Sequence, residues 1–379
     1  MTKTIILYDT NKYSHKSCFG FNNQMYNKLL KYKNKIDQLS VPTLWDKAKK
    51  LGNDYELIYL PNKKNKYDSI ASYQPLSRSY FKLWEIIHDF ELLNDSYNYT
   101  ILCLAEGPGG FIEAINNYRQ KQSKIDNTTG ITLKSTNKDI PGWKKSNKFL
   151  SSNKHIKITY GSDNTGNLYN LDNIIYLKKN HNNNDFITAD GGFDFSNDFN
   201  NQEELSYRII FCEIVTALAT QKEGGTFVCK IFDSYTFITI KFLYLLYNFY
   251  EEVYITKPYT SRPANSEKYI VCKKFKTINE SYLTLLFSYI KNWDYYYKNK
   301  FRDFLSFIEL PYIFFKKINV YNNVLTNNQI NNIEKTLSFI DIEDKEIIDS
   351  ITTIQTKKAL EWCKLYSIEI NKFSLHISV

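Results

Sequence analysis

The chain has 379 residues, of which 43% are hydrophobic, and a formal net charge of +9. This length is enough for one large α/β domain with extensions, or for two domains, around a hydrophobic core. The positive charge favours a polyanionic partner, although a compositional bias toward lysine would by itself give the same excess of positive charge. The six cysteines occur singly and form no CxxC pair, so buried free thiols in a reducing compartment are expected rather than a zinc site or a disulfide framework.

The sequence shows neither a signal peptide nor a membrane span. The apolar run near the N-terminus is too short for the first. The most apolar long segment, 236–255, contains Lys241, Glu251 and Glu252, which excludes the second. We therefore expect a soluble intracellular protein without a membrane partner.

The N-terminal part of the chain, residues 1–70, is polar and lysine-rich and is expected to form an extension of mixed structure. The segment 77–93 then places apolar residues at helical spacing, which predicts an amphipathic helix. Lys82 lies early in this helix, beside Phe81. A lone lysine at such a position is ordinarily solvated, so only the rest of the chain can give it a role.

The stretch 101–114, ILCLAEGPGGFIEA, reads as a short apolar strand, a glycine-rich turn and the start of a helix. Gly107, Gly109 and Gly110 permit a sharp turn and leave space for a ligand beside the backbone. Open α/β sheets bind nucleotides and related cofactors at such a strand end. The spacing matches neither GxGxxG nor a phosphate loop, which argues against a dinucleotide or a triphosphate. A turn without any ligand has the same signature.

Two further strands are predicted at 130–133 and 156–160. The second leads into a loop that contains Asp163. A carboxylate there can accept a hydrogen bond from a ribose or an exocyclic amine, but a turn aspartate is equally frequent at such places.

A fourth strand, 185–190, ends at Asp190 before two glycines. After a helix at about 203–220, a fifth strand at 224–232 carries Lys230 among apolar residues. That position is costly for an ammonium group unless a partner compensates its charge.

An aromatic helix at 235–250 precedes a sixth strand, 252–256, and a seventh, 268–275. No helix separates these two strands, so they are expected to form an antiparallel hairpin at the end of the sheet. The predicted fold is therefore α/β, with a seven-stranded, mostly parallel sheet whose last strand is antiparallel. This is the methyltransferase variant of the Rossmann-like fold.

Two lysines and two carboxylates, Lys82, Asp190, Lys230 and Glu267, stand out as one candidate site. Asp190 and Lys230 are expected at the ends of neighbouring strands, beside the glycine-rich loop. Burial and a second cation would each lower the pKa of one lysine toward the working pH of a general base, while the carboxylates would oppose that shift and orient the amine. Such a site could deprotonate an alcohol beside an electrophile. A buried salt-bridge network would contain the same residue types.

Seven segments carry a resemblance to a known family. In chain order they are SRSYFKLWEI, LAEGPGGFIEAI, GITLKSTN, YGSDNTGNLYN, TADGGFDFS, GGTFVCKIFD and KPYTSRPANSEKYIVCK. Together, over residues 77–275, they resemble the RrmJ/FtsJ-type family of S-adenosylmethionine-dependent RNA 2′-O-methyltransferases. Within that family they are most similar to the eukaryotic and viral cap-specific mRNA 2′-O-methyltransferases.

The resemblance implies that Lys82, Asp190, Lys230 and Glu267 form the Lys-Asp-Lys-Glu tetrad of the family, with Lys230 as the general base. It implies S-adenosylmethionine as the cofactor and no metal. Many relatives have an acidic residue where Cys103 stands, and Glu106 is expected to supply that carboxylate instead. The implied cofactor-binding residues are Glu106, Gly107, Pro108, Gly109, Gly110, Phe111, Asp163 and Asp190. Those expected near the substrate nucleotide are Arg262, Asn265 and Ser266.

The expected reaction is methyl transfer to the 2′-hydroxyl of the first transcribed nucleotide of capped mRNA, which converts cap 0 to cap 1. Three alternatives remain open: 2′-O-methylation of ribosomal or transfer RNA, a catalytically silent RNA-binding subunit of a capping complex, and a methyltransferase for small molecules. The 5′ end of capped mRNA and other capping enzymes are the expected partners, whereas the sequence leaves the oligomeric state open. The expected location is the nucleus or cytoplasm, or a cytoplasmic replication site or virion for a large DNA virus.

We divide the chain into an N-terminal extension, 1–70, a catalytic α/β domain, 71–280, and a C-terminal extension, 281–379. The last segment contains no glycine and is aromatic and lysine-rich. It is expected to be mostly helical, and either to extend a nucleic-acid groove or to cover the edge of the sheet.

Overall fold

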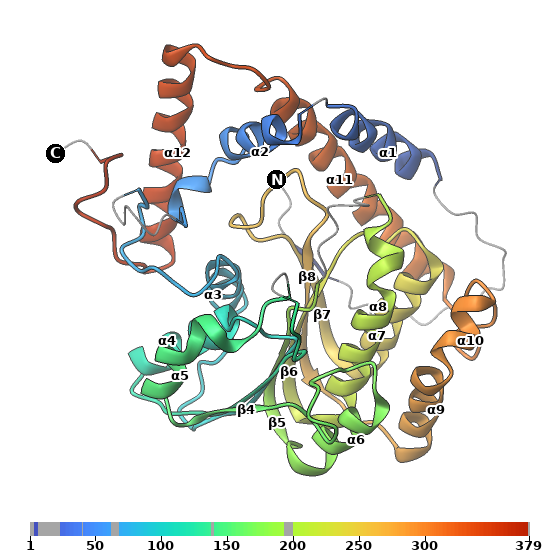
Figure 1. Ribbon diagram of the computed structural model, residues 1–379. Helices are drawn as coiled ribbons and strands as arrows, with labels where there is room; N and C mark the ends of the chain where they lie inside the picture. Colours follow the sequence, from blue (N-terminus) through green and yellow to red (C-terminus); the bar gives the residue numbers. More distant parts are fainter. Residues whose placement is uncertain are drawn as a thin grey trace.

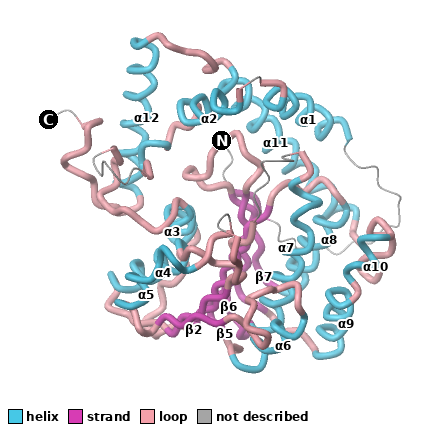
Figure 2. The backbone as a smooth tube through the Cα atoms, viewed as in Figure 1, coloured by secondary structure: helices cyan, strands magenta, loops and turns pink. Residues whose placement is uncertain are grey.

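The computed structural model describes residues 4–6, 23–39, 41–61, 68–137, 140–192 and 200–377. Helices cover both faces of a central mixed sheet, and further helices lie above one end of its strands (Figures 1 and 2). In chain order the strands are β1 (Thr4–Ile6), β2 (Thr100–Leu104), β3 (Asn127–Ile131), β4 (Ile156–Thr159), β5 (Asn184–Ala189), β6 (Gln221–Ile231), β7 (Tyr250–Thr256) and β8 (Lys268–Phe275).

The order of the strands across the sheet is β1-β7-β8-β6-β5-β2-β3-β4. The five strands from β4 to β6 are parallel, whereas β8 lies antiparallel between β6 and β7. This confirms the predicted seven strands and their antiparallel last member. The eighth strand, β1, was not predicted. It has only three residues, in the short apolar run near the N-terminus, and it is paired antiparallel with β7 at the edge of the sheet.

The helices predicted at 77–93, 203–220 and 235–250 are confirmed as α3 (Ser79–Asp89), α7 (Gln202–Thr220) and α8 (Phe237–Phe249). The first is shorter than predicted, because Glu91 and Leu93, with φ of 52° and 63°, leave the right-handed helical region. The helices are α1 (Asn23–Asp37), α2 (Pro42–Leu51), α3 (Ser79–Asp89), α4 (Gly110–Lys121), α5 (Asn147–Ser152), α6 (Leu171–Asn180), α7 (Gln202–Thr220), α8 (Phe237–Phe249), α9 (Glu280–Lys291), α10 (Trp293–Lys298), α11 (Tyr312–Leu337) and α12 (Lys345–Leu365).

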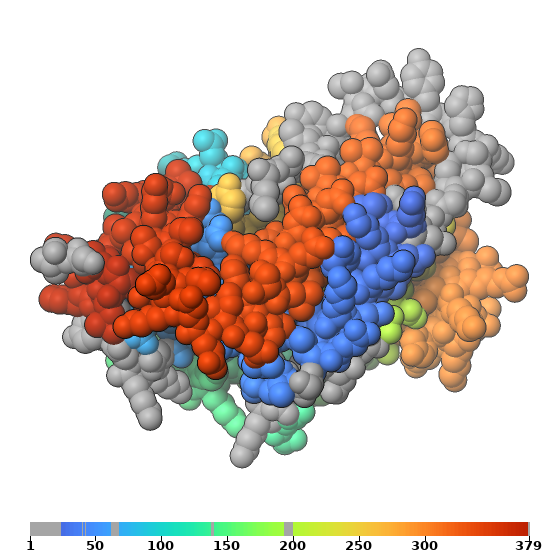
Figure 3. All heavy atoms as spheres, turned by 90° about the horizontal axis from the view of Figure 1, so that it is seen from above, coloured from blue at the N-terminus to red at the C-terminus, as the bar shows by residue number. Residues whose placement is uncertain are grey.

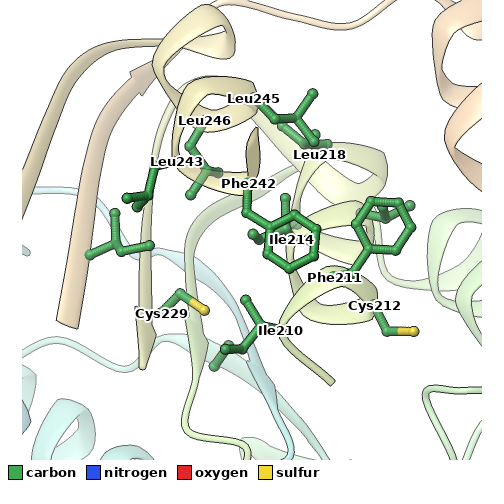
Figure 4. Packing of buried hydrophobic residues seen from close by; sticks show 14 of the residues in the cluster. Ile210, Phe211, Cys212, Ile214, Leu218, Cys229, Phe242, Leu243, Leu245 and Leu246 are labelled. Carbon is green, nitrogen blue, oxygen red and sulfur yellow. The ribbon is translucent and has the colours of Figure 1, made fainter. Parts of the chain in front are cut away.

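Apolar side chains fill the space between the sheet and the helices on each face. On one face they come from α6, α7, α8, α9 and α11, and Figure 4 shows the part where α7 and α8 meet β6. There Phe211 stacks on Phe242 with ring centroids 5.5 Å apart. On the other face they come from α3, α4 and α12. Because both faces are covered, a strand such as β2, TILCL, is apolar on both of its faces rather than alternating.

The cysteines of the described residues are buried free thiols, as expected from their single occurrence; they are Cys103, Cys212, Cys229, Cys272 and Cys363. Cys18 lies outside the described residues. No helix in the described ranges is long and apolar enough to span a bilayer.

Two helices from the N-terminal part of the chain, α1 and α2, each contact α11 from the C-terminal part. They lie above the loop between β7 and β8, and from above α1 and α11 are seen side by side (Figures 1 and 3). The last helix, α12, also contacts α2. It packs on α3 as well, where the rings of Phe81 and Trp362 have centroids 5.7 Å apart. The Trp84 indole N–H of α3 donates to the carbonyl oxygen of Tyr366, directly after α12, at 2.8 Å. The N-terminal and C-terminal segments are thus packed on the predicted catalytic segment, and the boundaries at 70 and 280 stay predictions.

Candidate active site

The glycine-rich turn joins the end of β2 to the start of α4. Gly109 has φ of +108°, a conformation that favours glycine, and a Cβ on Gly107 would lie 2.6 Å from the Pro141 carbonyl oxygen. Glu106 Oε1 accepts hydrogen bonds from the N–H groups of Phe111 and Ile112, at 2.9 and 3.1 Å. The carboxylate of Glu106 therefore binds two amide groups at the N-terminus of α4 that have no partner within the helix, and this fixes the turn.

The second carboxylate oxygen of Glu106, Oε2, does not take part in these hydrogen bonds. Oε2 is buried and has no hydrogen-bond partner in the described part of the chain. Burial, and then the charge of Asp190, raise the pKa of Glu106 well above its usual range. A buried carboxylate with a free oxygen and a second anion nearby is a favourable place for a positively charged ligand.

Lys230 and Asp190 form one ion pair of the site. Lys230 Nζ lies 3.1 Å from Asp190 Oδ1 and donates to the Asp190 backbone oxygen at 2.8 Å. The Tyr269 hydroxyl donates to the same Oδ1 at 3.4 Å. Asp190 directly follows β5 and Lys230 lies near the end of β6, so the parallel pairing of these strands brings the two residues together.

Lys82 and Glu267 form the second pair, and the distances from Lys82 Nζ to the two carboxylate oxygens are 2.7 and 2.8 Å. Lys82 comes from α3, whereas Glu267 directly precedes β8. Burial opposes ionisation of Glu267, but the charges of Lys82 and Lys230 outweigh it and lower the pKa of Glu267 to about 2. The structure thus brings together all four residues of the predicted tetrad.

The electrostatics of Lys230 differ from the expectation that a lysine of this site has a lowered pKa. Burial does act to lower the pKa of Lys230, but the charges of Asp190 and Glu267 outweigh it, and the pKa lies above its usual value. The expectation is wrong for Lys230, because Asp190 lies within ion-pair distance of its amine and Glu267 adds a second negative charge.

Asp163 lies in the exposed loop after β4, where it organises its neighbours. Its Oδ1 accepts from the Thr165 backbone N–H at 2.9 Å and from Asn173 Nδ2 at 2.9 Å, and its Oδ2 accepts from Asn170 Nδ2 at 2.7 Å. Hydrogen bonding from Thr165 is the main reason that the pKa of Asp163 lies below its usual range. Asp163 therefore acts as a turn aspartate, and its contact with an adenosine stays a prediction.

The three residues predicted near the substrate nucleotide all have protein partners. Arg262 Nη2 lies 2.7 Å from Glu56 Oε1, and Asn265 Oδ1 accepts from Lys257 Nζ at 2.7 Å. Ser266 is 2% exposed and donates to Asp233 Oδ2 at 2.9 Å. These contacts order the loop between β7 and β8, and a direct contact of the three side chains with a nucleotide stays a prediction.

A cavity of about 310 Å³ lies beside this loop and was not predicted. Its lining includes Lys257, Lys268 and Lys358, together with Tyr55 and Tyr259, whose rings stack with centroids 5.0 Å apart. It also contains five side-chain amides, those of Asn53, Asn265, Asn328, Gln329 and Asn332. No spacing rule could have shown this site, because its residues come from segments that are distant in the sequence.

Lys257 connects this cavity to the tetrad. Its Nζ donates to the backbone oxygens of Asn265 and Glu267, at 2.9 and 2.8 Å. Burial, opposed by the charge of Glu267, lowers the pKa of Lys257 to about 7. The only signal in the sequence was a lysine directly after an apolar strand.

In the described part of the chain, no three His, Cys, Asp or Glu side chains are grouped so as to hold a metal ion.

Known proteins resemble this chain in sequence. Residues 75–275 match the FtsJ-like methyltransferase family. The cap-specific mRNA (nucleoside-2′-O-)-methyltransferase 1 of Dictyostelium discoideum is 35% identical over 248 residues, which cover 59% of this chain and 32% of that protein. The human protein of the same name is 36% identical over 179 residues, 45% of this chain and 21% of that protein. The chain thus spans about a third of the length of such curated relatives, or less.

A solved structure of a protein described as a ribosomal RNA methyltransferase, from Plasmodium falciparum, aligns with a TM-score of 0.38 at 21% identity. The alignment covers 53% of this chain and 99% of that chain. A likeness at this score supports no conclusion about substrate.

Proposed function

The chain belongs to the FtsJ-like methyltransferase family, and from this premise we propose that it transfers a methyl group from S-adenosylmethionine to the 2′-hydroxyl of the first transcribed nucleotide of capped mRNA. The convergence of Lys82, Asp190, Lys230 and Glu267 as two ion pairs at the carboxyl end of the sheet carries the proposal. The names of the relatives described above support the choice of substrate. Such a substrate implies a nuclear or cytoplasmic location.

The residues beside the tetrad fit S-adenosylmethionine. When bound, this cofactor supplies an electrophilic methyl group on a positively charged sulfonium. Glu106 Oε2 is buried without a partner. The charge of Asp190 helps to raise the pKa of Glu106, so a cation bound beside both residues would favour the ionised form of Glu106. Gly107 and Gly109 add no side chain on either side of Pro108 in that turn. We propose that this turn holds the methionine part of the cofactor, and that the loop of Asp163 holds the adenosine.

Lys230 is proposed as the base that receives the proton of the 2′-hydroxyl. Only the unprotonated amine can accept it, and Asp190 and Glu267 raise the pKa of Lys230 in the free protein. Any cation that binds beside these carboxylates lowers that pKa, because it offsets their charge. The activity is therefore expected to rise with pH, and Asp190→Asn is expected to move that rise to lower pH.

Lys82 and Glu267 are proposed to orient the ribose. Lys82 has the charge to hold an oxygen of the substrate, and Glu267 fixes its amine through two contacts of 2.7 and 2.8 Å. Holding hydroxyl, methyl and sulfur in line is expected to supply much of the acceleration, because a fixed near-attack geometry removes an entropic cost.

The cavity beside the loop between β7 and β8 supports a capped rather than an uncapped substrate. Its volume of about 310 Å³ is at the lower end of the range for small-molecule sites. Aromatic rings stack on bases and lysines bind phosphates, and here Tyr55, Tyr259, Lys257 and Lys358 offer both. We propose that it accepts the cap nucleotide while the tetrad holds the next ribose.

The test is methyl transfer from labelled S-adenosylmethionine to a short capped RNA, compared with the same RNA without its cap. Digestion of the product locates the label. Label on the 2′-oxygen of the first nucleotide, lost in Lys230→Ala, is the expected result. Equal labelling of both RNAs would contradict the capped substrate and favour ribosomal or transfer RNA. Cofactor binding without transfer to either RNA would favour a silent RNA-binding subunit.

A further inference from the structure

A second cluster of buried charges lies behind the tetrad, around Asp233. Its Oδ2 lies 3.0 Å from Lys33 Nζ, its Oδ1 lies 3.3 Å from Lys268 Nζ, and Ser266 Oγ donates to Oδ2 at 2.9 Å. The side chains of Lys33, Asp233 and Lys268 are only 8%, 4% and 6% exposed. Both oxygens of the carboxylate are thus engaged away from solvent.

The position of this cluster in the chain links it to Glu267. Ser266 and Lys268, both bound to Asp233, are the two neighbours of Glu267 in the sequence. Asp233 lies three residues after Lys230, and β6 is paired with β8 so that Ile231 lies opposite Lys268. One buried carboxylate therefore ties both sides of Glu267 to the strand that carries Lys230.

Lys33 brings a distant part of the chain to this cluster. It lies in α1, outside the residues 75–275 that match the family, and its Nζ also donates to Ser266 Oγ at 3.1 Å. The helix α11, which lies beside α1 (Figure 3), adds a further contact, because Gln329 Nε2 donates to the Ala264 backbone oxygen at 3.1 Å. Both helices thus hold the segment that ends in Glu267.

A buried ionic cluster is a weak source of stability, because desolvation offsets most of the attraction between its charges. Asp233 already has Lys268 as a partner of opposite charge, so Lys33 is not needed to neutralise it. What Lys33 adds is geometry: it binds Asp233 and Ser266 at the same time. Fixing the atoms around a reacting group to a fraction of an ångström is where such contacts have a large effect.

We propose that Lys33 is a positioning residue for the tetrad, which acts through Asp233 and Ser266 to hold Glu267 against Lys82. The effect on catalysis rests on the function proposed above, whereas the effect of Lys33 on the position of Glu267 is independent of it. Loss of the Lys33 contacts lets the segment 264–268 shift, so Glu267 moves away from Lys82 and the substrate ribose is no longer aligned.

The first test needs no substrate. An amine-reactive acylating reagent modifies lysines in the full chain, and peptide mass spectrometry measures the rate at Lys82. Lys82 paired with Glu267 is protected, so Lys33→Met is expected to raise its rate of modification several-fold, as Glu267→Gln does, without a change at the exposed Lys148. Lys31→Met, on the exposed side of α1, is the matched control and is expected to change nothing.

The second test measures methyl transfer in the wild type, Lys33→Met, Glu267→Gln and the double variant. Lys33→Met is expected to lower kcat on the order of 10- to 100-fold while the Kd for S-adenosylmethionine stays within twofold. Lys33→Arg is expected to restore part of the loss. In the Glu267→Gln background, the change of Lys33 is expected to have little further effect.

Three results would overturn the proposal: unchanged reactivity of Lys82 in Lys33→Met, an equal increase at all lysines, or the same fold loss of activity in both backgrounds. Each would mean that Lys33 only stabilises the fold. If Lys33→Met does not fold, Ser266→Ala keeps every charge of the cluster and removes the hydroxyl that joins Lys33 and Asp233 to the residue before Glu267. It is expected to give the same change at Lys82. If the wild type does not methylate capped RNA, the proposed function fails, and the modification of Lys82 still decides the role of Lys33.

Discussion

The two neighbouring strands β5 and β6 carry a lysine–aspartate ion pair at each of their ends. At the amino end, Lys222 Nζ lies 2.7 Å from Asp185 Oδ1, and at the carboxyl end Lys230 Nζ lies 3.1 Å from Asp190 Oδ1. The residue types are the same and the distances are close. The side chain of Lys222 is 51% exposed, however, and that of Lys230 is 12% exposed.

This difference in exposure separates a structural pair from a functional one. Asp185 also accepts the Thr100 backbone N–H at 2.9 Å, so the pair at the amino end helps to fix the start of β2. Asp185 is only 9% exposed, but water reaches the ammonium group of the half-exposed Lys222, so the pair is expected to contribute little to stability, less than about 1 kcal/mol. At the carboxyl end the same chemistry is buried beside a second pair and the unpartnered oxygen of Glu106. Surroundings, rather than residue type, decide which pair can do chemistry.

The largest expected effect comes from making the same substitution at both ends. Lys230→Met is expected to lower methyl transfer by about 10³-fold, in the range found for loss of a general base. Lys222→Met is expected to leave the rate within twofold, because Lys222 is exposed and far along the strand. Single-turnover rates with saturating cofactor measure both. Equal losses in the two variants would mean that the carboxyl-end pair has no special role.

The next effect concerns stability at the amino end of the sheet. Arg119 is 1% exposed; its Nε lies 2.9 Å from Asp126 Oδ2 and its Nη1 donates to the Leu93 oxygen at 2.8 Å. Arg119→Met is expected to lower the free energy of unfolding by about 3–5 kcal/mol, because it leaves a buried aspartate without its cation. Urea unfolding measures the loss, with Lys154→Met, an exposed change nearby, as the control.

The activity of the folded fraction of Arg119→Met is expected to stay near that of the wild type. Substantial inactivation of protein that remains folded would show that the amino end of the sheet also contributes to the chemistry, and the contrast between the two ends would fail.

A smaller effect is expected from pH. Glu267 has a pKa of about 2 in the folded protein against an ordinary value of 4.5, so its ionisation stabilises the fold above about pH 4.5 and this contribution is lost as the pH falls toward 2. Between pH 6 and pH 3 the loss is about 2 kcal/mol, from the difference in proton binding. Glu267→Gln is expected to remove that part of the acid dependence of the unfolding free energy.

Urea midpoints measured across this pH range test the effect, with the exposed Glu280→Gln as the control. If the unfolding free energy falls equally with decreasing pH in the wild type and in Glu267→Gln, the charges of Lys82 and Lys230 do not lower the pKa of Glu267 in solution.

The smallest effect extends the comparison to another strand end. Asp163 follows β4, and its Oδ2 has Asn170 Nδ2 as a hydrogen-bond partner at 2.7 Å. If this carboxylate also binds the adenosine, Asp163→Asn weakens cofactor binding by about tenfold, the loss of one hydrogen bond to a charged group. Calorimetry with S-adenosylmethionine measures the change, and Asp172→Asn in the first turn of α6 is the control. Unchanged affinity would restrict Asp163 to its role in the turn.

The seven main strands and the proximity of Asp190 to Lys230 could be predicted from the residues, whereas the full tetrad was implied by the family resemblance. Apolar runs without alternation predicted the central strands, because strands that are covered on both faces have no polar side. The glycines of the turn after β2 predicted a bend that leaves no room for side chains. Asp190 and Lys230 could be placed together because parallel strands bring their carboxyl ends to one edge of the sheet. The seven motifs, in their order along the chain, indicated the family.

The contacts between distant segments could not be predicted from local patterns. The three residues of β1 have no pattern of their own and are extended because the edge of β7 is available for pairing. The direction of the pKa shift of Lys230 depends on the distances to two carboxylates, which no spacing in the sequence contains. Lys33 looks like any lysine of a polar helix until α1 is placed against Asp233 and Ser266, more than 190 residues away. Local patterns determine elements, but buried charge depends on what packs around it.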